Sequence, residues 1–262
     1  MTLRELSERY GRSRRWIQEE IHRYEPTLKR RIPRAVTLVM DATFFGKREE
    51  KFGLLVAMDS ASSEPIAYDF IVGETKESYR RLIDQIRKDG FGIQAVVLDG
   101  RPGISALFPG IPVQMCHFHM QAILTRKLTR NPKLEASRSL KALSASLDRY
   151  TQEEFTRTLE NWHTGYANFL KEKSINEVTG SWQYKHRAIR SAYFSLKRFL
   201  PLLYTYKNHP ELNIPNTTNH LDGGCFSPLK SLLQVHRGIS RELKRKLIIA
   251  FLENRIIRTP KS

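Results

Sequence analysis

The spacing of apolar residues changes along this chain, and each change predicts a different kind of structure. Near the N-terminus, apolar residues recur at helical spacing on both sides of Gly11, and Ser13 stands where it can cap a second helix. Further on, β-rich runs at 36–45, 52–60 and 65–73 are divided by charged or Ser- and Glu-containing turns. The pattern predicts two short N-terminal helices, then a meander of three antiparallel strands.

A helix and two more strands are predicted after the meander. Four apolar residues have the i, i+3, i+4, i+7 spacing of an amphipathic helix: Tyr79, Leu82, Ile83 and Ile86. Gly90 ends this helix, and apolar runs at 93–100 and 111–115 follow with a short crossover between them. This is the element order of a ribonuclease H-like mixed sheet, in which the later strands lie parallel to the first. The predicted fold class is therefore α/β.

Residues 120–210 carry helical patterns rich in Leu, Lys and Arg, without a convincing strand. Trp162 belongs to a clean apolar stripe and is expected in a helical core. A final helix is predicted from about Ser240 to Arg255. The expected organisation has four parts: a helix-turn-helix-like segment and linker at 1–35, the first part of the ribonuclease H-like core at 36–119, an all-helical insertion at 120–212, and the last part of the core with its C-terminal helix at 213–262.

Charge is unevenly distributed over the 262 residues. The chain has 44 Lys and Arg against 27 Asp and Glu, a formal net charge of +17. Segments 1–35, 117–215 and 216–262 carry +5, +8 and +6, whereas segment 36–116 carries −2. Such a surplus favours polyanionic partners, nucleic acid before an acidic membrane surface, although basic residues also simply solvate helix faces. An apolar content of 40% excludes a disordered basic tail.

Other features of the composition narrow the class of protein. No apolar run approaches a membrane span or resembles a signal peptide, so no membrane partner is expected. The chain has two cysteines, Cys116 and Cys225, which argues against a disulfide-stapled secreted scaffold and a structural zinc ribbon. A reducing cytoplasm suits this composition.

The N-terminal pattern of helix, glycine turn and Ser-capped helix is the outline of a helix-turn-helix. In that interpretation Arg14, Arg15 and Gln18 lie at the start of a recognition helix, the part that enters the major groove. Two short helices bury little on their own, so a third must come from elsewhere in the fold. An amphipathic helical hairpin docked on the main domain explains the pattern equally well.

Two aspartates follow apolar strands and are candidates for chemistry. Asp41 comes after VTLVM and Asp99 after AVVL. An acid at the end of a buried strand is costly unless it faces a cleft, a cation or a hydrogen-bond network. If the two strands are neighbours, the carboxylates converge at one rim of the sheet as hard oxygen ligands for two Mg²⁺ ions. Taken singly, each Asp is equally a strand-end or turn residue.

Four motifs, taken together in their order and spacing, resemble the DDE transposases of bacterial insertion sequences in the Mutator-like superfamily. These motifs are VMDAT at 39–43, VLDG at 97–100, CHFH at 116–119 and NTTNHLDGG at 216–224. The resemblance covers roughly 36–258 and implies a ribonuclease H-like core with a helical domain inserted before the last catalytic acid. The gaps of 58 positions from Asp41 to Asp99 and 123 from Asp99 to Asp222 leave room for that insertion.

The resemblance implies that Asp41, Asp99 and Asp222 are the catalytic and metal-binding residues. Two Mg²⁺ ions, replaceable by Mn²⁺, would activate water to cut a strand at the element end and then align the freed 3′-hydroxyl for attack on target DNA. The family has Glu where this chain has Asp222, one methylene shorter, and a misplacement of about 1 Å costs about 10²-fold in rate. Thr217 or Thr218 is expected to cap the following helix and place Asp222 at its first turn.

Cys116 and His119 match a Cys-x-x-His signature of the same family. They are predicted to brace the active site or position substrate, with Asn219 of the NTTN motif as a further support. Zinc is disfavoured because the cluster of Cys116, His117 and His119 has no evident fourth ligand. A half-buried structural pair is the alternative.

Basic residues beside aromatic ones are candidates for contacts with DNA. Trp182 stands near Lys185 and Arg187 and can stack on an unpaired or flipped base, although a helical core position is the more ordinary interpretation. The C-terminal candidates are Arg237, Lys244 and Arg245, which equally fit a solvated helix face.

The predicted function is that of a DNA transposase located in the bacterial cytoplasm with the nucleoid. It would bind double-stranded DNA, both element ends and target, and act as a homo-oligomer in the DNA complex. The first alternative is a catalytically inactive DNA-binding protein descended from a transposase. It is suggested by Asp222, whose side chain is one methylene shorter than the Glu of the family. The second is a stand-alone nuclease of the same core fold, which would cut and never join.

Overall fold

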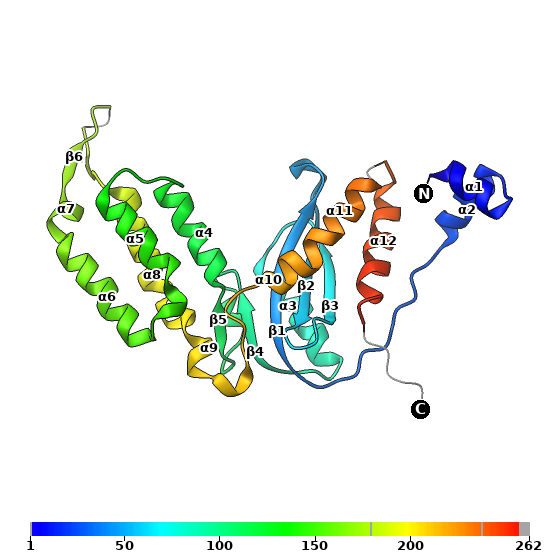
Figure 1. Ribbon diagram of the computed structural model, residues 1–262, viewed down its shortest axis with the longest axis horizontal. Coiled ribbons are helices and arrows are strands. Elements are labelled where there is room, and N and C mark those ends of the chain that lie inside the picture. The colour runs from blue at the N-terminus through cyan, green and yellow to red at the C-terminus, as the bar shows by residue number, and fades with distance from the viewer. Residues whose placement is uncertain (1, 179, 237, 257–262) are drawn as a thin grey trace.

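A mixed five-stranded sheet lies at the centre of the computed structural model, which describes residues 2–178, 180–236 and 238–256 (Figure 1). The strand order is β3-β2-β1-β4-β5. The strands are β1 (Ala35–Phe45), β2 (Phe52–Asp59), β3 (Pro65–Ile71), β4 (Gly92–Leu98) and β5 (Val113–Met115). Each coincides with a β-rich run of the sequence, so the mixed α/β class is confirmed.

Strand directions divide the sheet into an antiparallel and a parallel part. Neighbours β1–β2 and β2–β3 are antiparallel, whereas β1–β4 and β4–β5 are parallel. The prediction that the later strands run parallel to the first is confirmed. The parallel pairing sets the middle of β1 beside the end of β4, which matters for Asp41 within β1 and Asp99 after β4.

Helices cover both faces of the sheet and form a separate lobe beyond β5 (Figure 1). The helices are α1 (Leu3–Tyr10), α2 (Arg14–Arg23), α3 (Lys76–Lys88), α4 (His117–Leu128), α5 (Glu135–Ala145), α6 (Gln152–Gly165), α7 (Ala167–Lys171), α8 (Arg187–Leu203), α9 (Thr205–Asn208), α10 (Asn219–Leu221), α11 (Ser227–Val235) and α12 (Arg241–Glu253). A single π-helical turn, Asp222–Phe226, joins α10 to α11. Short 3₁₀ turns lie at Arg48–Glu50, Ser105–Leu107, Leu147–Arg149 and Pro210–Leu212.

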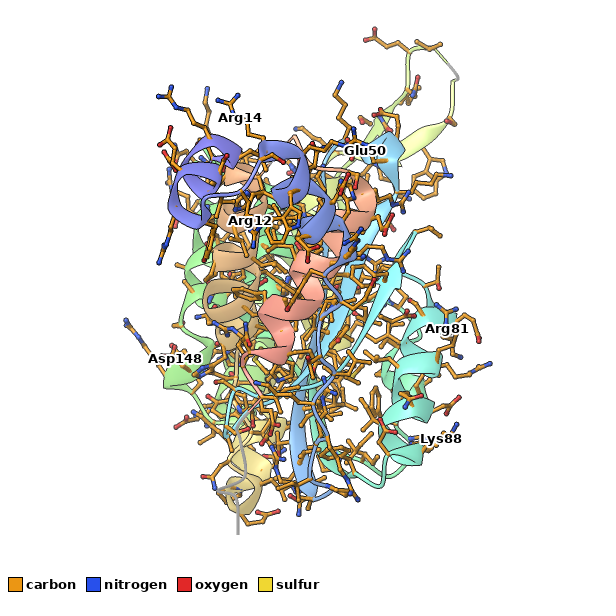
Figure 2. The ribbon with its side chains drawn as sticks, turned by 90° about the vertical axis from the view of Figure 1, so that its right-hand side faces the viewer. Arg12, Arg14, Glu50, Arg81, Lys88 and Asp148 are labelled. Carbon is orange, nitrogen blue, oxygen red and sulfur yellow. The ribbon has the colours of Figure 1, made fainter. Side chains whose placement is uncertain are left out.

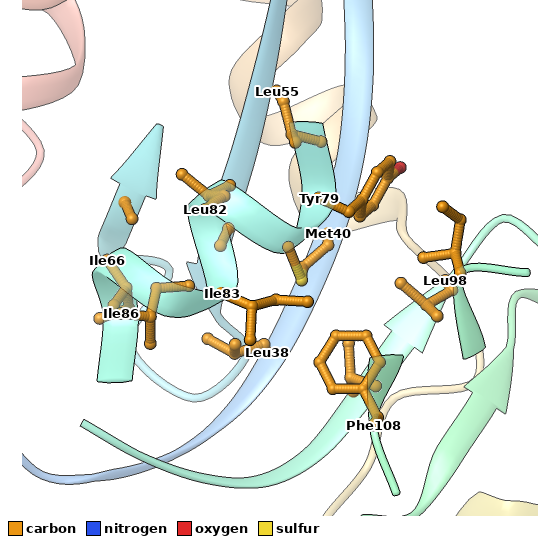
Figure 3. Packing of buried hydrophobic residues seen from close by; sticks show 14 of the residues in the cluster. Leu38, Met40, Leu55, Ile66, Tyr79, Leu82, Ile83, Ile86, Leu98 and Phe108 are labelled. Carbon is orange, nitrogen blue, oxygen red and sulfur yellow. The ribbon is translucent and has the colours of Figure 1, made fainter. Parts of the chain in front are cut away.

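One face of the sheet packs against α3 (Figure 3). A capping box at Thr75 starts this helix, and its buried apolar residues are the four whose spacing predicted it. They pack against β1 and β2 side chains that include Leu38, Met40 and Leu55. Burying each large apolar side chain contributes about 1.5–3 kcal/mol, so this face fixes the position of the α3 N-terminus.

The opposite face carries the alternate side chains of the same strands. Val39, Leu54 and Val97 lie there and pack against α10, α11 and α12. The helical residues in this cluster include Leu221, Phe226, Leu229, Leu233, Ile248 and Leu252. The C-terminal part of the chain therefore returns to the sheet after the helical lobe and covers the face toward which Asp41, two positions beyond Val39, is directed.

The lobe formed by α4 to α9 has its own apolar core. Trp162 belongs to it, is 9% exposed and donates a hydrogen bond to the Ser139 hydroxyl at 2.9 Å, as predicted for a core residue. The expectation of an all-helical insertion is wrong in one respect, because β6 (Lys173–Ile175) and β7 (Trp182–Tyr184) form an antiparallel hairpin. Strands of three residues are too short to display an alternating pattern.

The N-terminal helices begin and end where the sequence predicted. Gly11 adopts a left-handed conformation after α1 with φ of 60°, and the Ser13 hydroxyl accepts a hydrogen bond from the Trp16 amide. Lys246 of α12 holds this segment, through Glu25 at 2.7 Å and the His22 carbonyl at 2.8 Å. Figure 2 shows the two helices beside α12, with Arg14 at their outer surface. Within the described residues, no helix has both the length and the apolarity needed to cross a membrane.

Candidate functional site: a carboxylate cluster at the sheet edge

Asp41 and Asp99 come together because β1 and β4 are parallel neighbours. Val39 lies opposite Val97, and each aspartate follows two positions later. β1 does not end at Asp41: as the β-rich run at 36–45 predicted, it continues to Phe45, still paired with β2, after β4 has ended at Leu98. Asp41 is therefore buried at 6% exposure, whereas Asp99 is partly exposed and accepts a hydrogen bond from the Arg101 amide at 2.9 Å.

Glu74, which the sequence interpretation missed, lies with these two acids. Three potential ligand atoms, one from each residue, lie within 4.8 Å of one another in the group Asp41, Glu74 and Asp99. Glu74 precedes the capping residue of α3, so the packing of that helix against the sheet carries it to the cluster. Both of its oxygens are engaged, one by the Tyr79 hydroxyl at 2.8 Å and the other by the Arg101 guanidinium.

Asp222 and His119 form a second group that shares Asp41 with the first. One ligand atom each from Asp41, His119 and Asp222 lie within 4.8 Å of one another. His119 comes from the first turn of α4, and Asp222 begins the π-helical turn after α10. The structure thus brings Asp99 and Asp222 around the buried carboxylate of Asp41, although the three acids are 58 and 123 positions apart in sequence.

Cys116 and Thr218 connect the elements that carry this second group. The Thr218 amide donates to the Cys116 sulfur at 3.3 Å, and both side chains are fully buried. The Thr218 hydroxyl donates to Asp222 Oδ2 at 2.9 Å, and the His117 amide donates to the Asn216 carbonyl at 2.9 Å. These bonds fix α4 against the segment that leads into α10.

The expectation that Thr217 or Thr218 caps the next helix is met in position by Thr218, but the side-chain bond of a cap is missing. Thr218 is the first flanking residue of α10 and makes no side-chain cap bond, because its hydroxyl is directed to Asp222 instead. Among the described contacts, Asn219 has no side-chain hydrogen bond to the acids, and it is exposed at the start of α10. His117 also points elsewhere and hydrogen-bonds the Leu203 carbonyl at 2.7 Å.

Burial and neighbouring charges shift the proton affinities of the cluster. Burial raises the pKa of Asp41 to about 7; His119 opposes this, and Asp222 and Asp99 add to it. Cys116 and then Asp41 raise the pKa of His119 to about 9, against the effect of burial. In the absence of another cation, an imidazolium at His119 therefore balances part of the acidic charge.

The donor atoms fit divalent metal ions. Asp41, Glu74 and Asp99 offer hard oxygen ligands of the kind that Mg²⁺ prefers, and Asp41, His119 and Asp222 offer two oxygens and a nitrogen. Asp41 Oδ1 accepts from the Ala42 amide at 2.7 Å, which fixes the orientation of the shared carboxylate. Two ion positions bridged by one carboxylate are an arrangement suited to phosphoryl transfer.

Arg101 stands at the border of two hollows beside the cluster. One, of about 590 Å³, is lined by Phe44, Lys47, Lys51 and Glu74 among others. The other, of about 190 Å³, is lined by Gly100, Arg198 and Phe199 among others. The cations in both walls suit a polyanion that approaches the acids from either side of Arg101.

The predicted DNA-contacting residues are distributed over three surfaces. Trp182, Lys185 and Arg187 lie on or beside the β6–β7 hairpin; Trp182 is 58% exposed, so its interpretation as helical core is wrong. The Trp182 ring packs 4.1 Å from the Lys173 ammonium, which orients it without burying it.

On α12, Arg245 is exposed and stacks on Phe70, and Lys244 is partly exposed; Arg237 lies outside the described residues. Arg14 and Arg15 are exposed at the start of α2, as a recognition helix would require. Gln18 lines a groove between the N-terminal helices and α12.

Comparison with known proteins gives no indication of the function, which is therefore inferred from the geometry of the site. The chain matches no protein-family model and no curated protein.

Proposed function

We propose that this protein is a DNA transposase of the DDE type, which binds the ends of a mobile element and catalyses metal-dependent strand cleavage and strand transfer. One observation carries the proposal: Asp41 is shared by two groups of potential metal ligands, one containing Asp99 and the other Asp222. Two metal ions that share a carboxylate are the recurrent device of enzymes that cut and join phosphodiesters.

The arrangement of strands supports a ribonuclease H-like core. The order β3-β2-β1-β4-β5, with an antiparallel meander and two later parallel strands, is the one expected for such a core. The helical lobe enters between β5 and α10, before Asp222, as the resemblance requires. The helices α1 and α2, with Arg14 and Arg15 exposed at the start of α2, are in this proposal a helix-turn-helix-like contact with DNA.

The side chains of the cluster have separable roles in this reaction. The metal ions would be held by Asp41, Asp99 and Asp222. Glu74 would join these ligands when Arg101 releases its carboxylate. The bound ions supply the Lewis acidity that activates water and then a 3′-hydroxyl toward phosphate. Arg101, 41% exposed and paired with Glu74, is placed to exchange this partner for a DNA phosphate. Cys116 and Thr218 act as positioning residues because they hold Asp222 and the start of α4.

The basic β6–β7 hairpin is proposed to hold DNA near a cleaved end. Replacing Lys185 and Arg187 by Gln should reduce the slope of log affinity against log salt by about 2, since each phosphate contact contributes about 0.9. The measurement is fluorescence anisotropy with duplex DNA over a range of salt concentrations. The matched control replaces Arg81 and Lys88 on the outer surface of α3 (Figure 2), with the same loss of charge. An equal loss in both variants would contradict a specific role for the hairpin.

Strand transfer is the test of the proposed function itself. Purified full-length protein, Mg²⁺ or Mn²⁺, a DNA end taken from the sequence flanking the reading frame and a plasmid target should yield cleaved ends and joined products. Asp99→Asn should lose both activities, because it removes a ligand oxygen on the exposed side of the cluster. Full activity in Asp99→Asn would disprove the assignment. Cutting without joining would indicate a nuclease, and salt-sensitive binding without cutting an inactive DNA-binding descendant.

A further inference from the structure

The two groups of potential metal ligands around Asp41 differ in their chemistry. The group with Glu74 and Asp99 contains carboxylates alone, whereas the group with Asp222 includes the imidazole of His119. Mg²⁺ strongly prefers oxygen ligands, and nitrogen ligands favour divalent transition ions. The imidazole therefore favours a transition ion in the group that contains it.

The separation between His119 and Asp41 fits two ligands of one ion. His119 Nε2 lies 3.9 Å from Asp41 Oδ2, which is longer than a hydrogen bond of about 2.7–3.2 Å. Ligand atoms about 2.1 Å from a common octahedral ion are about 3.0 Å apart when adjacent and about 4.2 Å apart when opposite. The two atoms are therefore too far apart to bond each other, and their separation lies between these two values, near enough for both to reach one cation after a small adjustment.

The surroundings of this group hold its two carboxylates in place. Asp41 Oδ1 accepts from the Ala42 amide and Asp222 Oδ2 from the Thr218 hydroxyl, which leaves each carboxylate its other oxygen to offer. Thr218 is bonded in turn to Cys116, three residues before His119. Hydrogen bonds of this kind around a metal site orient the ligands, and their loss commonly costs about 10- to 100-fold in affinity.

We infer that the two positions are not equivalent: Asp41, His119 and Asp222 bind a divalent transition ion through His119 Nε2, and Asp41, Glu74 and Asp99 bind Mg²⁺. This inference rests on the proposed function, because both ions would serve the same phosphoryl transfer. His119 then binds metal directly, a role distinct from the bracing that the sequence suggested.

Mn²⁺ binding to the full-length protein tests the inference by pulsed electron paramagnetic resonance. Wild-type protein with one equivalent of Mn²⁺ in an excess of Mg²⁺ should retain the Mn²⁺ and show coupling to a ¹⁴N nucleus. His119→Gln should lose that coupling and at least about tenfold of the preference for Mn²⁺. Its amide oxygen remains available as a ligand for Mg²⁺.

Two control variants separate the possible explanations. His220→Gln, an exposed histidine on α10, should keep the nitrogen coupling. Glu74→Gln should weaken Mg²⁺ binding and leave the coupling unchanged. Wild-type protein without ¹⁴N coupling, or a His119→Gln protein that retains it, would overturn the inference. Mg²⁺-dependent cleavage that is lost in Asp99→Asn would still support the proposed function in that case, so the two failures are distinguishable.

Discussion

Replacing Asp41 with Asn should stabilise the metal-free protein at pH 8 while abolishing DNA cleavage. Burial raises the pKa of Asp41 to about 7 from its ordinary value of 3.8, so its ionised form is disfavoured in the folded state. This rise in pKa corresponds to about 4 kcal/mol of unfolding free energy. Asn cannot ionise, and its amide oxygen can still accept from the Ala42 amide.

The sign of this effect depends on pH in a defined way. Between about pH 4 and pH 7 the folded wild-type protein binds more protons at Asp41 than the unfolded chain does, so its stability falls as the pH rises. Above pH 7 the full cost of the buried charge is present, and near pH 4 it has disappeared. The advantage of Asp41→Asn should therefore be largest at pH 8 and close to zero at pH 4.

Urea denaturation in the presence of a metal chelator measures the stabilisation, and the DNA cleavage assay measures the loss of activity. Cleavage should fall by more than about 10²-fold, the loss that a misplacement of about 1 Å already causes. Asp59→Asn is the matched control, because Asp59 is equally buried but pairs with Arg34 at 2.9 Å. That variant should be destabilised. An Asp41→Asn protein less stable than wild type at pH 8 would show that its charge is compensated in the fold.

Replacing Asp222 with the longer Glu should slow the proposed strand cleavage by about 10²-fold, although the family that the sequence resembles carries Glu at this position. The Asp222 carboxylate already lies within 4.8 Å of ligand atoms from Asp41 and His119, and Thr218 fixes its orientation at 2.9 Å. The π-helical turn that begins at Asp222 supplies the local shift that the shorter side chain needs. An added methylene moves the carboxylate by more than 1 Å from this position.

Single-turnover cleavage rates of Asp222→Glu and Asp222→Asn test this expectation. Asp222→Asn should lose activity almost entirely, and Asp222→Glu should keep a residual rate. Thermal melting of both variants should stay close to that of wild type, because the side chain is only partly buried. A Glu variant faster than wild type would mean that the Asp222 carboxylate is poorly placed for catalysis. This protein would then be a slower enzyme than members of the family it resembles.

Local patterns were sufficient to predict much of the fold. The strands β1 to β4, the helix α3 and the caps at Gly11 and Ser13 follow from periodicity and capping preferences within a few residues. Asp41 and Asp99 were predictable as a pair because each lies two positions beyond Val39 and Val97, which face each other in neighbouring parallel strands. Asp222 was found through its motif and not through any local pattern.

Other parts of the site could not be predicted in this way. Glu74 stands in a polar turn, and only the packing of α3 against the sheet brings it to Asp41. Thr218 has the sequence context of a helix cap, yet Cys116, 102 positions away, determines its surroundings. Trp182 is exposed because two very short strands form a hairpin that turns it away from the lobe.

By itself, the sequence predicted the strands of the central sheet and the helix α3, showed the contrast between an acidic centre and basic flanks, and singled out three aspartates as candidates. Tertiary structure alone decided that Asp41 is buried, that Glu74 and His119 complete two different groups around it, and that Cys116 fixes Asp222 through Thr218. The physical reason is range: caps and periodicity act over a few neighbouring residues, whereas burial and metal coordination depend on atoms that the packing of β1, α3, α4 and α10 brings within 5 Å.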